Sequence, residues 1–175
     1  MPKNAYFFGL GASLLITTLV TGSLIINAGS PLSVTRGDAF LVNFILKHWL
    51  RVITSGDWGS LTTLPMLFGF KDSLFFTDHH FIQAIMALPL YLLTKNVIIT
   101  SNLLIVFTMF FSSFSMYLFA FHLTKKVLPG ILASIIFVFN PFIMARFPDQ
   151  LILFSLQWIP LIFLSWEKLI KSTTI

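Results

Sequence analysis

Long apolar runs dominate this chain and are separated by short polar stretches. The first run, 5–26, contains no charged residue and is long enough to cross a bilayer. It is long for a signal peptide and no small-residue cleavage motif follows it, so we interpret it as a retained spanning helix. Three further runs, at 97–123, 128–145 and 151–167, have a similar character. The pattern therefore predicts an all-α polytopic membrane bundle with about four spanning helices.

A shorter apolar segment at 80–94 differs from these runs because it is brief and contains Pro89. At about 1.5 Å per residue, such a helix does not cross a hydrocarbon core roughly 30 Å thick. We predict that it is an interfacial helix. The whole stretch 27–96 then forms one large extracytoplasmic loop.

The lysines support this topology. If 80–94 does not span, the lysines that flank the apolar runs share one side: Lys3, Lys125, Lys126, Lys168 and Lys171. Basic residues near helix ends favour the cytoplasmic side, so we expect a cytoplasmic N-terminus in a plasma (inner) membrane. Five of the six acids then lie on the outer side: Asp38, Asp57, Asp72, Asp78 and Asp149.

A second interfacial helix is predicted at 38–55. Asn43, Lys47 and Arg51 recur every four residues and form a polar stripe, whereas aromatic and aliphatic residues cover the other face. On this interpretation Trp49 lies at headgroup depth and enters the bilayer. Asp38 is a good N-cap, and Gly56 is expected to end the helix.

Composition agrees with a membrane protein. Hydrophobic residues make up 57% and charged residues 10% of the 175, with a mean hydropathy of +0.91, whereas a soluble domain carries about 25% charged residues. The net charge of +5 is scattered among apolar runs, which argues against nucleic acid as a partner. The chain has no cysteine, so disulfides and thiol chemistry are excluded.

Three polar groups are expected at the outer membrane face. The first is Arg36 with Asp38, the second is Asp78 with His79 and His80, and the third is Arg146 with Asp149 and Gln150. A carboxylate at the edge of a dry site can act as a general base, and neighbouring bases can hold a phosphate.

Each group also has a purely structural interpretation. Asp38 is explained by capping, and Arg146 with Asp149 by a snorkelling base beside a solvated turn acid. Asp78 and His79 are candidate ligands for a divalent metal, although neighbouring histidines point apart in a helix. We expect His48 and His122 to be packing or interfacial residues, and Asn140-Pro141 to kink the third span.

Several stretches resemble a known family. In order and spacing, "GDAFLVNFIL", "FVFNPFIMARF" and "LQWIPL" resemble the N-terminal part of C-type multi-spanning membrane glycosyltransferases, which are related to protein mannosyltransferases and aminoarabinose transferases. "SMYLFAFHLTKK" is similar to that family's second spanning helix. Because the chain ends in "EKLIKSTTI" directly after an apolar run, we expect an N-terminal part of a larger protein or a truncated product.

The resemblance implies a mechanism. Asp38 matches the catalytic acid of the first outer loop, and Asp149 lies where relatives carry a second polar site, often with His instead of Asp-Gln. The implied donor is a sugar on a polyprenyl phosphate, handled outside the cytoplasm. Arg36, Asp78, His79 and His80 are the expected phosphate-handling residues, and Arg146, Asp149 and Gln150 further substrate-binding residues.

Two alternatives compete with this hypothesis. One is a non-catalytic membrane protein, either a transporter piece or an assembly subunit. A transporter would carry more polar groups at mid-helix depth than Asn102 and the Asn140-Pro141 pair. The other is an inactive fragment that keeps the fold alone.

The topology is directly testable because the chain has no cysteine. Single cysteines introduced at Thr124 and Gln150 should react with a membrane-impermeant maleimide from opposite sides of the membrane. Labelling of both positions from one side would contradict the four-span arrangement.

Overall fold

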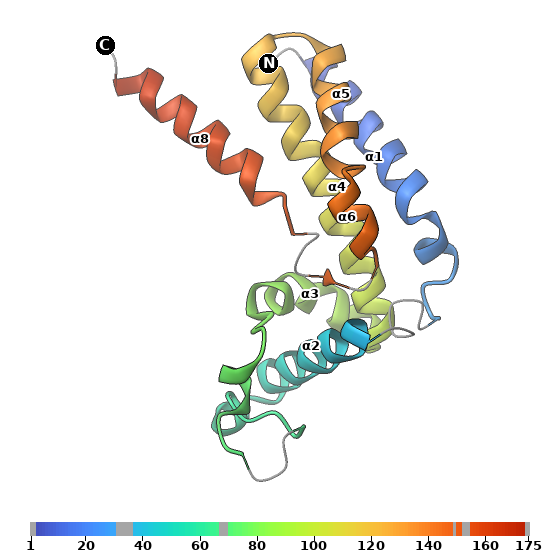
Figure 1. Ribbon diagram of the computed structural model, residues 1–175, viewed down its shortest axis with the longest axis vertical. Coiled ribbons are helices and arrows are strands. Elements are labelled where there is room, and N and C mark those ends of the chain that lie inside the picture. Colours follow the sequence, from blue (N-terminus) through green and yellow to red (C-terminus); the bar gives the residue numbers. More distant parts are fainter. Residues whose placement is uncertain (1–2, 31–36, 67–69, 149, 152–154, 174–175) are drawn as a thin grey trace. The chain divides into compact units, whose positions relative to one another are not determined.

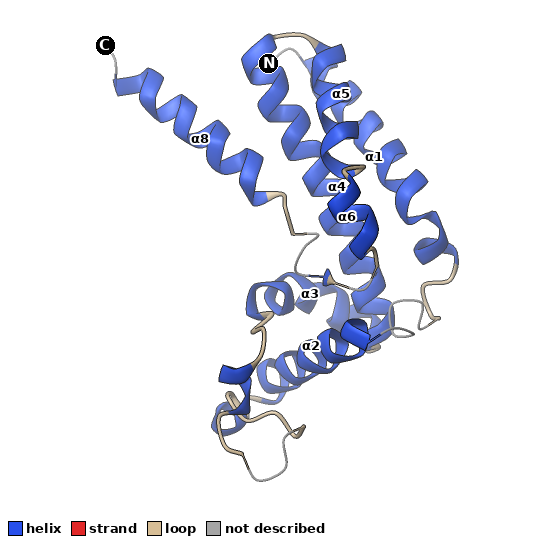
Figure 2. Ribbon diagram, viewed as in Figure 1, coloured by secondary structure: helices blue, strands red, loops and turns tan. Residues whose placement is uncertain are grey.

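The computed structural model describes residues 3–30, 37–66, 70–148, 150–151 and 155–173. Within these residues the elements are helices, and no β-strand is present (Figures 1 and 2). The α-helices are α1 Lys3–Ile26, α2 Gly37–Ser55, α3 Phe81–Thr94, α4 Val97–Thr124, α5 Val127–Val138, α6 Pro141–Arg146 and α8 Trp158–Thr173. Two short 3-10 helices are η1 Trp58–Ser60 and η2 Ser73–Phe76. The predicted all-α class is confirmed.

Three helical segments of the described residues are long and apolar enough to cross a membrane: α1, α4 and the stretch Val127–Arg146. The chain is a membrane protein. α3 is apolar but has only 14 residues, in keeping with the interfacial role predicted for 80–94.

The fourth predicted span, 151–167, overlaps α8 only in part. α8 begins at Trp158, continues to Thr173 and has 16 residues, which gives a length of about 24 Å at about 1.5 Å per residue. Residues 152–154 lie outside the described residues. A fourth crossing therefore stays a prediction.

The predicted kink at Asn140-Pro141 is confirmed as a capped break between α5 and α6. The Asn140 amide donates to the Phe137 carbonyl at 3.2 Å and accepts from the Ile143 N–H at 3.1 Å. Pro141 opens α6, where its missing N–H costs nothing. One side chain thus satisfies backbone groups on both sides of the break, which is required inside a membrane.

The chain forms two compact units, which we describe separately. The bundle unit contains 1–26, 105–147 and 153–175, and the loop unit contains 27–104 and 148–152. α4 is continuous and contributes residues to both units.

The core of the bundle unit is built around Tyr117 of α4, whose side chain is fully buried. Its hydroxyl donates to the carbonyl of Ala5 in α1 at 2.6 Å. The ring faces Gly9 of α1 and Gly130 of α5, where an added Cβ would lie closer than 3.0 Å to ring atoms. These glycines let three helices approach a large aromatic ring, as small residues do in membrane helix packing.

A polar contact supports the same packing. Ser134 of α5 donates to the carbonyl of Ser113 in α4 at 2.9 Å, in addition to its own helix's Gly130 carbonyl at 3.0 Å. Interhelical hydrogen bonds of this kind contribute about 0.6 kcal/mol on average in a membrane protein. They fix helix orientation more than they add stability.

The glycine contacts give a stability prediction. Gly9→Ala should lower the thermal unfolding midpoint in detergent, because the new methyl group overlaps the Tyr117 ring and overpacking costs about 1–3 kcal/mol. Gly11→Ala is the control, since nothing lies within 4 Å of a Cβ there. An equal decrease for both variants would contradict the packing described.

Candidate functional site

α2 carries the candidate catalytic residue and follows the sequence prediction closely at its C-terminal end. It ends at Ser55, and Gly56 adopts the left-handed backbone with φ 72°, which glycine tolerates without strain. At the other end α2 begins at Gly37, so Asp38 lies within the first helical turn. The N-cap role expected for Asp38 is therefore wrong. A carboxylate in the first turn still favours the helix through its dipole.

The buried face of α2 packs on protein, which corrects the expected orientation of two residues. Trp49 is 5% exposed; its indole N–H donates to the His79 carbonyl and its ring lies 4.8 Å from that of Phe81. Asn43 is also buried, although its stripe partners Lys47 and Arg51 are exposed. Trp49 thus fills the contact between α2 and α3 instead of entering lipid. Apolar periodicity alone does not distinguish these two surroundings.

Asp38 is held by a residue from far along the chain. Gln150 donates from Nε2 to Oδ2 of Asp38 at 2.5 Å, across 112 positions of sequence. Both residues belong to the loop unit, and the Asp38 side chain remains exposed. This hydrogen bond connects the first predicted polar group, through Asp38, with the third, through Gln150. Arg36 and Asp149, which neighbour these two residues, lie outside the described residues.

The second polar group precedes α3. Asp78 and His79 are exposed, and the His79 ring meets Phe75 edge-on with centroids 6.1 Å apart. His80 is 3% exposed and has a left-handed backbone with φ 47°. Among the described residues, no hydrogen bond or ion pair joins this group to Asp38. No cluster of three or more metal-ligating side chains occurs among them either.

Burial sets the protonation of His80. Desolvation lowers its pKa from the usual 6.5, and the nearby Asp78 opposes this shift with a smaller effect. The buried Nδ1 atom has no hydrogen-bond partner in the described structure. His80 is consequently better suited to be a neutral donor or acceptor than a cation for phosphate.

Arg146 belongs to the bundle unit and ends α6. Its guanidinium carbon lies 5.9 Å from the centroid of the Phe142 ring, within the range of a cation–π contact. This contact on its own helix agrees with the structural interpretation of Arg146 as an interfacial base.

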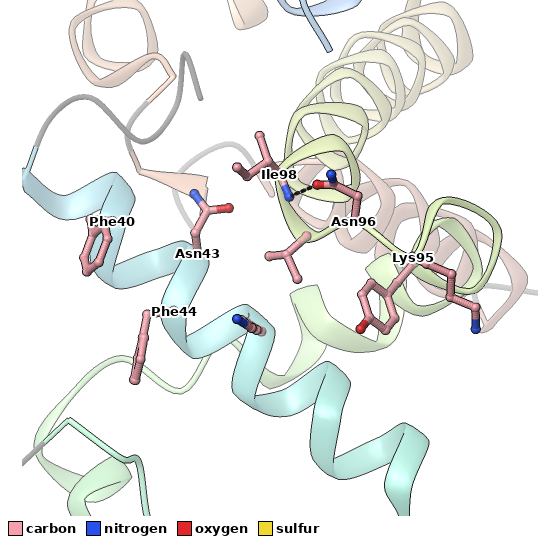
Figure 3. Close-up of a pocket in the computed structure, with 9 residues that line it drawn as sticks. Phe40, Asn43, Phe44, Lys95, Asn96 and Ile98 are labelled. Atoms are coloured by element: carbon pink, nitrogen blue, oxygen red, sulfur yellow. Dashed lines mark hydrogen bonds between the residues drawn. The ribbon is translucent and has the colours of Figure 1, made fainter. Parts of the chain in front are cut away.

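A pocket that the sequence did not reveal lies beside α2 in the loop unit (Figure 3). Its volume is about 470 Å³. The lining residues come from α2, the end of α3, the α3–α4 connection and the start of α4: Phe40, Asn43, Phe44, Lys47, Tyr91, Lys95, Asn96, Val97 and Ile98. Asn96 caps α4 by accepting the Ile98 N–H at 2.9 Å. An Asn before an apolar run is a recognisable helix start, so Asn96 could have been identified from the sequence.

Helix geometry separates this pocket from Asp38. Nine residues at about 100° each place Asp38 and Lys47 on opposite faces of α2. The pocket combines aromatic walls with Lys47 and Lys95, whereas Asp38 faces Gln150. Asp38 and Lys47 of α2 therefore have different neighbours: Asp38 contacts Gln150, and Lys47 lines the pocket.

Asn102 of α4 anchors the connection that leads from α1. Its Nδ2 donates to the carbonyls of Ala28 and Ser30 at 2.9 and 3.1 Å. The sequence marked Asn102 only as an isolated polar residue within a span, where such residues usually have a partner. Its structural role is to hold the connection on the approach to the candidate site.

The packing role expected for His48 is confirmed. It is 4% exposed, and its Nε2 lies 3.1 Å from the Leu61 carbonyl.

In comparisons with protein-family models, curated proteins and solved structures, no match to this chain was found.

The lowered pKa of His80 predicts an acid-sensitive loop unit. As pH falls through about 6.5, unfolded His80 binds a proton that the folded state resists, so stability falls with pH. Hydrogen–deuterium exchange at the start of α3, corrected for intrinsic rates, should therefore speed up at pH 5.5 relative to pH 7.5.

His80→Asn should reduce this pH effect, because Asn does not titrate and tolerates a left-handed backbone. The exposed neighbour provides the control, and His79→Asn should leave the effect intact. An unchanged pH response in His80→Asn would assign the acid sensitivity to another group.

Proposed function

We propose that this protein is a membrane glycosyltransferase that transfers a sugar from a polyprenyl-phosphate donor to an acceptor outside the cytoplasm, with Asp38 as the general base. The observation that carries the proposal is the hydrogen bond between Gln150 and the Asp38 carboxylate. The motif resemblance assigns both residues to the outer site, and they are far apart in sequence. A cap or a solvated turn acid does not require such a partner.

The location of the site suits a lipid-linked donor. The helices α1 and α4 are long and apolar enough to cross the membrane, and α2 and α3 lie between them in the sequence. A polyprenyl chain stays in the hydrocarbon and its phosphate stays at headgroup depth, so the reacting anomeric carbon is delivered to the interface. A soluble sugar nucleotide would need no such placement.

In the proposed reaction, the acceptor's hydroxyl oxygen attacks the anomeric carbon while Asp38 takes the hydroxyl proton. A new carbon–oxygen bond to the acceptor forms and the bond to the lipid phosphate breaks. The polyprenyl phosphate leaves with the bonding electron pair. Gln150 donates to Oδ2 and orients the carboxylate, whereas no hydrogen bond of the described residues occupies Oδ1. Oδ1 is the proposed proton acceptor.

The departing phosphate needs positive or hydrogen-bonding partners to stabilise its charge. We propose Arg36 for this role, with the Asp78–His80 group as a second contact to the donor. Burial favours the neutral form of His80, so its contribution is a hydrogen bond instead of a charge. Asp149 and Gln150 complete the proposed substrate-binding set, and the proposal requires no metal.

Asp38→Asn tests the proposal. In membranes supplied with a polyprenyl-phosphate-linked sugar, this variant should lower turnover by about 10²–10⁴-fold, the usual contribution of a general base. Gln150→Leu should cause a smaller decrease, because it leaves the general base itself in place. Arg36→Ala should chiefly weaken donor binding, since a phosphate contact acts on the bound donor as well as on the transition state.

Asp57→Asn provides the matched control. Asp57 is an exposed acid of the same loop that accepts from Ser60 within its own turn, so transfer should be unaffected. Undiminished transfer by Asp38→Asn would reduce Asp38 to a favourable first-turn residue. Absence of transfer by the unaltered protein would instead favour a non-catalytic membrane protein.

A further inference from the structure

A second cavity lies in the bundle unit, where the lysines of the α4–α5 turn and of α8 come together. Its volume is about 550 Å³. Three helices and the α4–α5 turn supply its walls: Tyr6 from α1, Leu118, Phe121 and His122 from α4, Lys125 from the turn, and Leu164 and Lys168 from α8. None of these residues belongs to the proposed catalytic site.

The cavity lies at one end of the spanning helices. Tyr6 is in the first turn of α1, and Lys125 directly follows α4, which ends at Thr124. The hydrogen bond from the Tyr117 hydroxyl to the Ala5 carbonyl connects the start of α1 to the C-terminal part of α4. A spanning helix ends at the membrane–water interface, so the cavity opens at headgroup depth.

The cavity has excess positive charge. Glu167, the neighbour of Lys168, already pairs with His122 and Lys171. Neither ammonium group of Lys125 and Lys168 has an ion-pair partner among the residues that the structure describes. Two unpaired lysines beside an occupied carboxylate favour an anionic ligand.

The polarity of the walls changes in the same direction along two helices. On the α4 side, Leu118 and Phe121 precede Lys125 by seven and four residues, which corresponds to about 10 and 6 Å of helix rise. On α8, Leu164 precedes Lys168 by one turn. His122, near the end of α4, pairs with Glu167 of α8, which directly precedes Lys168, so Lys125 and Lys168 both lie beyond this pair in chain direction. The cavity is therefore charged at its mouth and apolar toward the hydrocarbon.

We propose that this cavity binds an anionic phospholipid of the leaflet that adjoins the α4–α5 turn. The lipid phosphate lies between Lys125 and Lys168, with the Tyr6 hydroxyl available as a further donor, and an acyl chain runs along Leu118, Phe121 and Leu164. Basic cavities between spanning helices recognise lipid phosphates through such charge-assisted hydrogen bonds. A soluble anion would match the mouth but not the apolar walls.

Native mass spectrometry of the whole chain in a neutral detergent tests this proposal. Titration with phosphatidylglycerol should give a saturable bound lipid, whereas phosphatidylcholine should bind at least about tenfold more weakly. Lys125→Gln combined with Lys168→Gln should weaken phosphatidylglycerol binding by about tenfold or more, since each lysine contributes to holding the anionic headgroup.

Two further variants keep the result interpretable. Lys71→Gln with Lys126→Gln makes the same change in net charge outside the cavity and should leave binding unchanged. Lys125→Arg with Lys168→Arg keeps both charges and should bind phosphatidylglycerol within about threefold of the unaltered protein.

Three outcomes would overturn the proposal. The first is equal binding of phosphatidylcholine and phosphatidylglycerol. The second is an equal loss of binding in the Lys71 and Lys126 variant, which would indicate attraction by net charge alone. The third is displacement of phosphatidylglycerol by an equal concentration of inorganic phosphate, which would show that the apolar walls contribute nothing.

Discussion

The burial of the Tyr117 ring against two glycines is the constraint on which the bundle unit depends. An aromatic ring of this size fits between helices only where Gly9 and Gly130 leave space for it. Its hydroxyl would be an unsatisfied polar group in an apolar interior without the Ala5 carbonyl, a loss that costs about 1–3 kcal/mol. The ring therefore sets the spacing of α1, α4 and α5, and the hydroxyl sets the register of α1 along α4. The position of Tyr6 beside Lys125 follows from that register.

In the loop unit, hydrogen bonds from side chains to distant backbone or polar groups add to the packing of α2 and α3. Trp49 binds the His79 carbonyl and Asn102 binds two carbonyls of the α1–α2 connection. Gln150 binds Asp38 in the same manner. The loop unit also has an apolar core, which includes Ile45, Leu46 and Leu50 of α2. The hydrogen bonds fix the orientation of individual polar side chains in addition to that packing. They also give the proposed catalytic carboxylate a defined orientation.

The sequence predicted those features that local chemistry determines. The bounds of α1 and α4 follow the uncharged runs within two residues, because charges are costly in hydrocarbon. Gly56 and Asn140-Pro141 end or interrupt helices through their own backbone preferences. The all-α class follows from the same runs, since a lipid-exposed backbone must satisfy its hydrogen bonds within each segment.

Features that depend on a partner could not be predicted in this way. Trp49 and Asn43 were assigned to the wrong surroundings because lipid and the apolar surface of α3 favour the same residue types. The Asp38 partner, Gln150, is 112 positions away and carries no local signal.

The two proposals that involve a lipid phosphate differ in the groups that each site supplies. Both place a lipid phosphate at headgroup depth, but only the loop unit supplies a carboxylate that is free to accept a proton. Glu167, which neighbours Lys168 of the bundle cavity, is already paired with His122 and Lys171, so that cavity is suited to holding a lipid and not to transforming one.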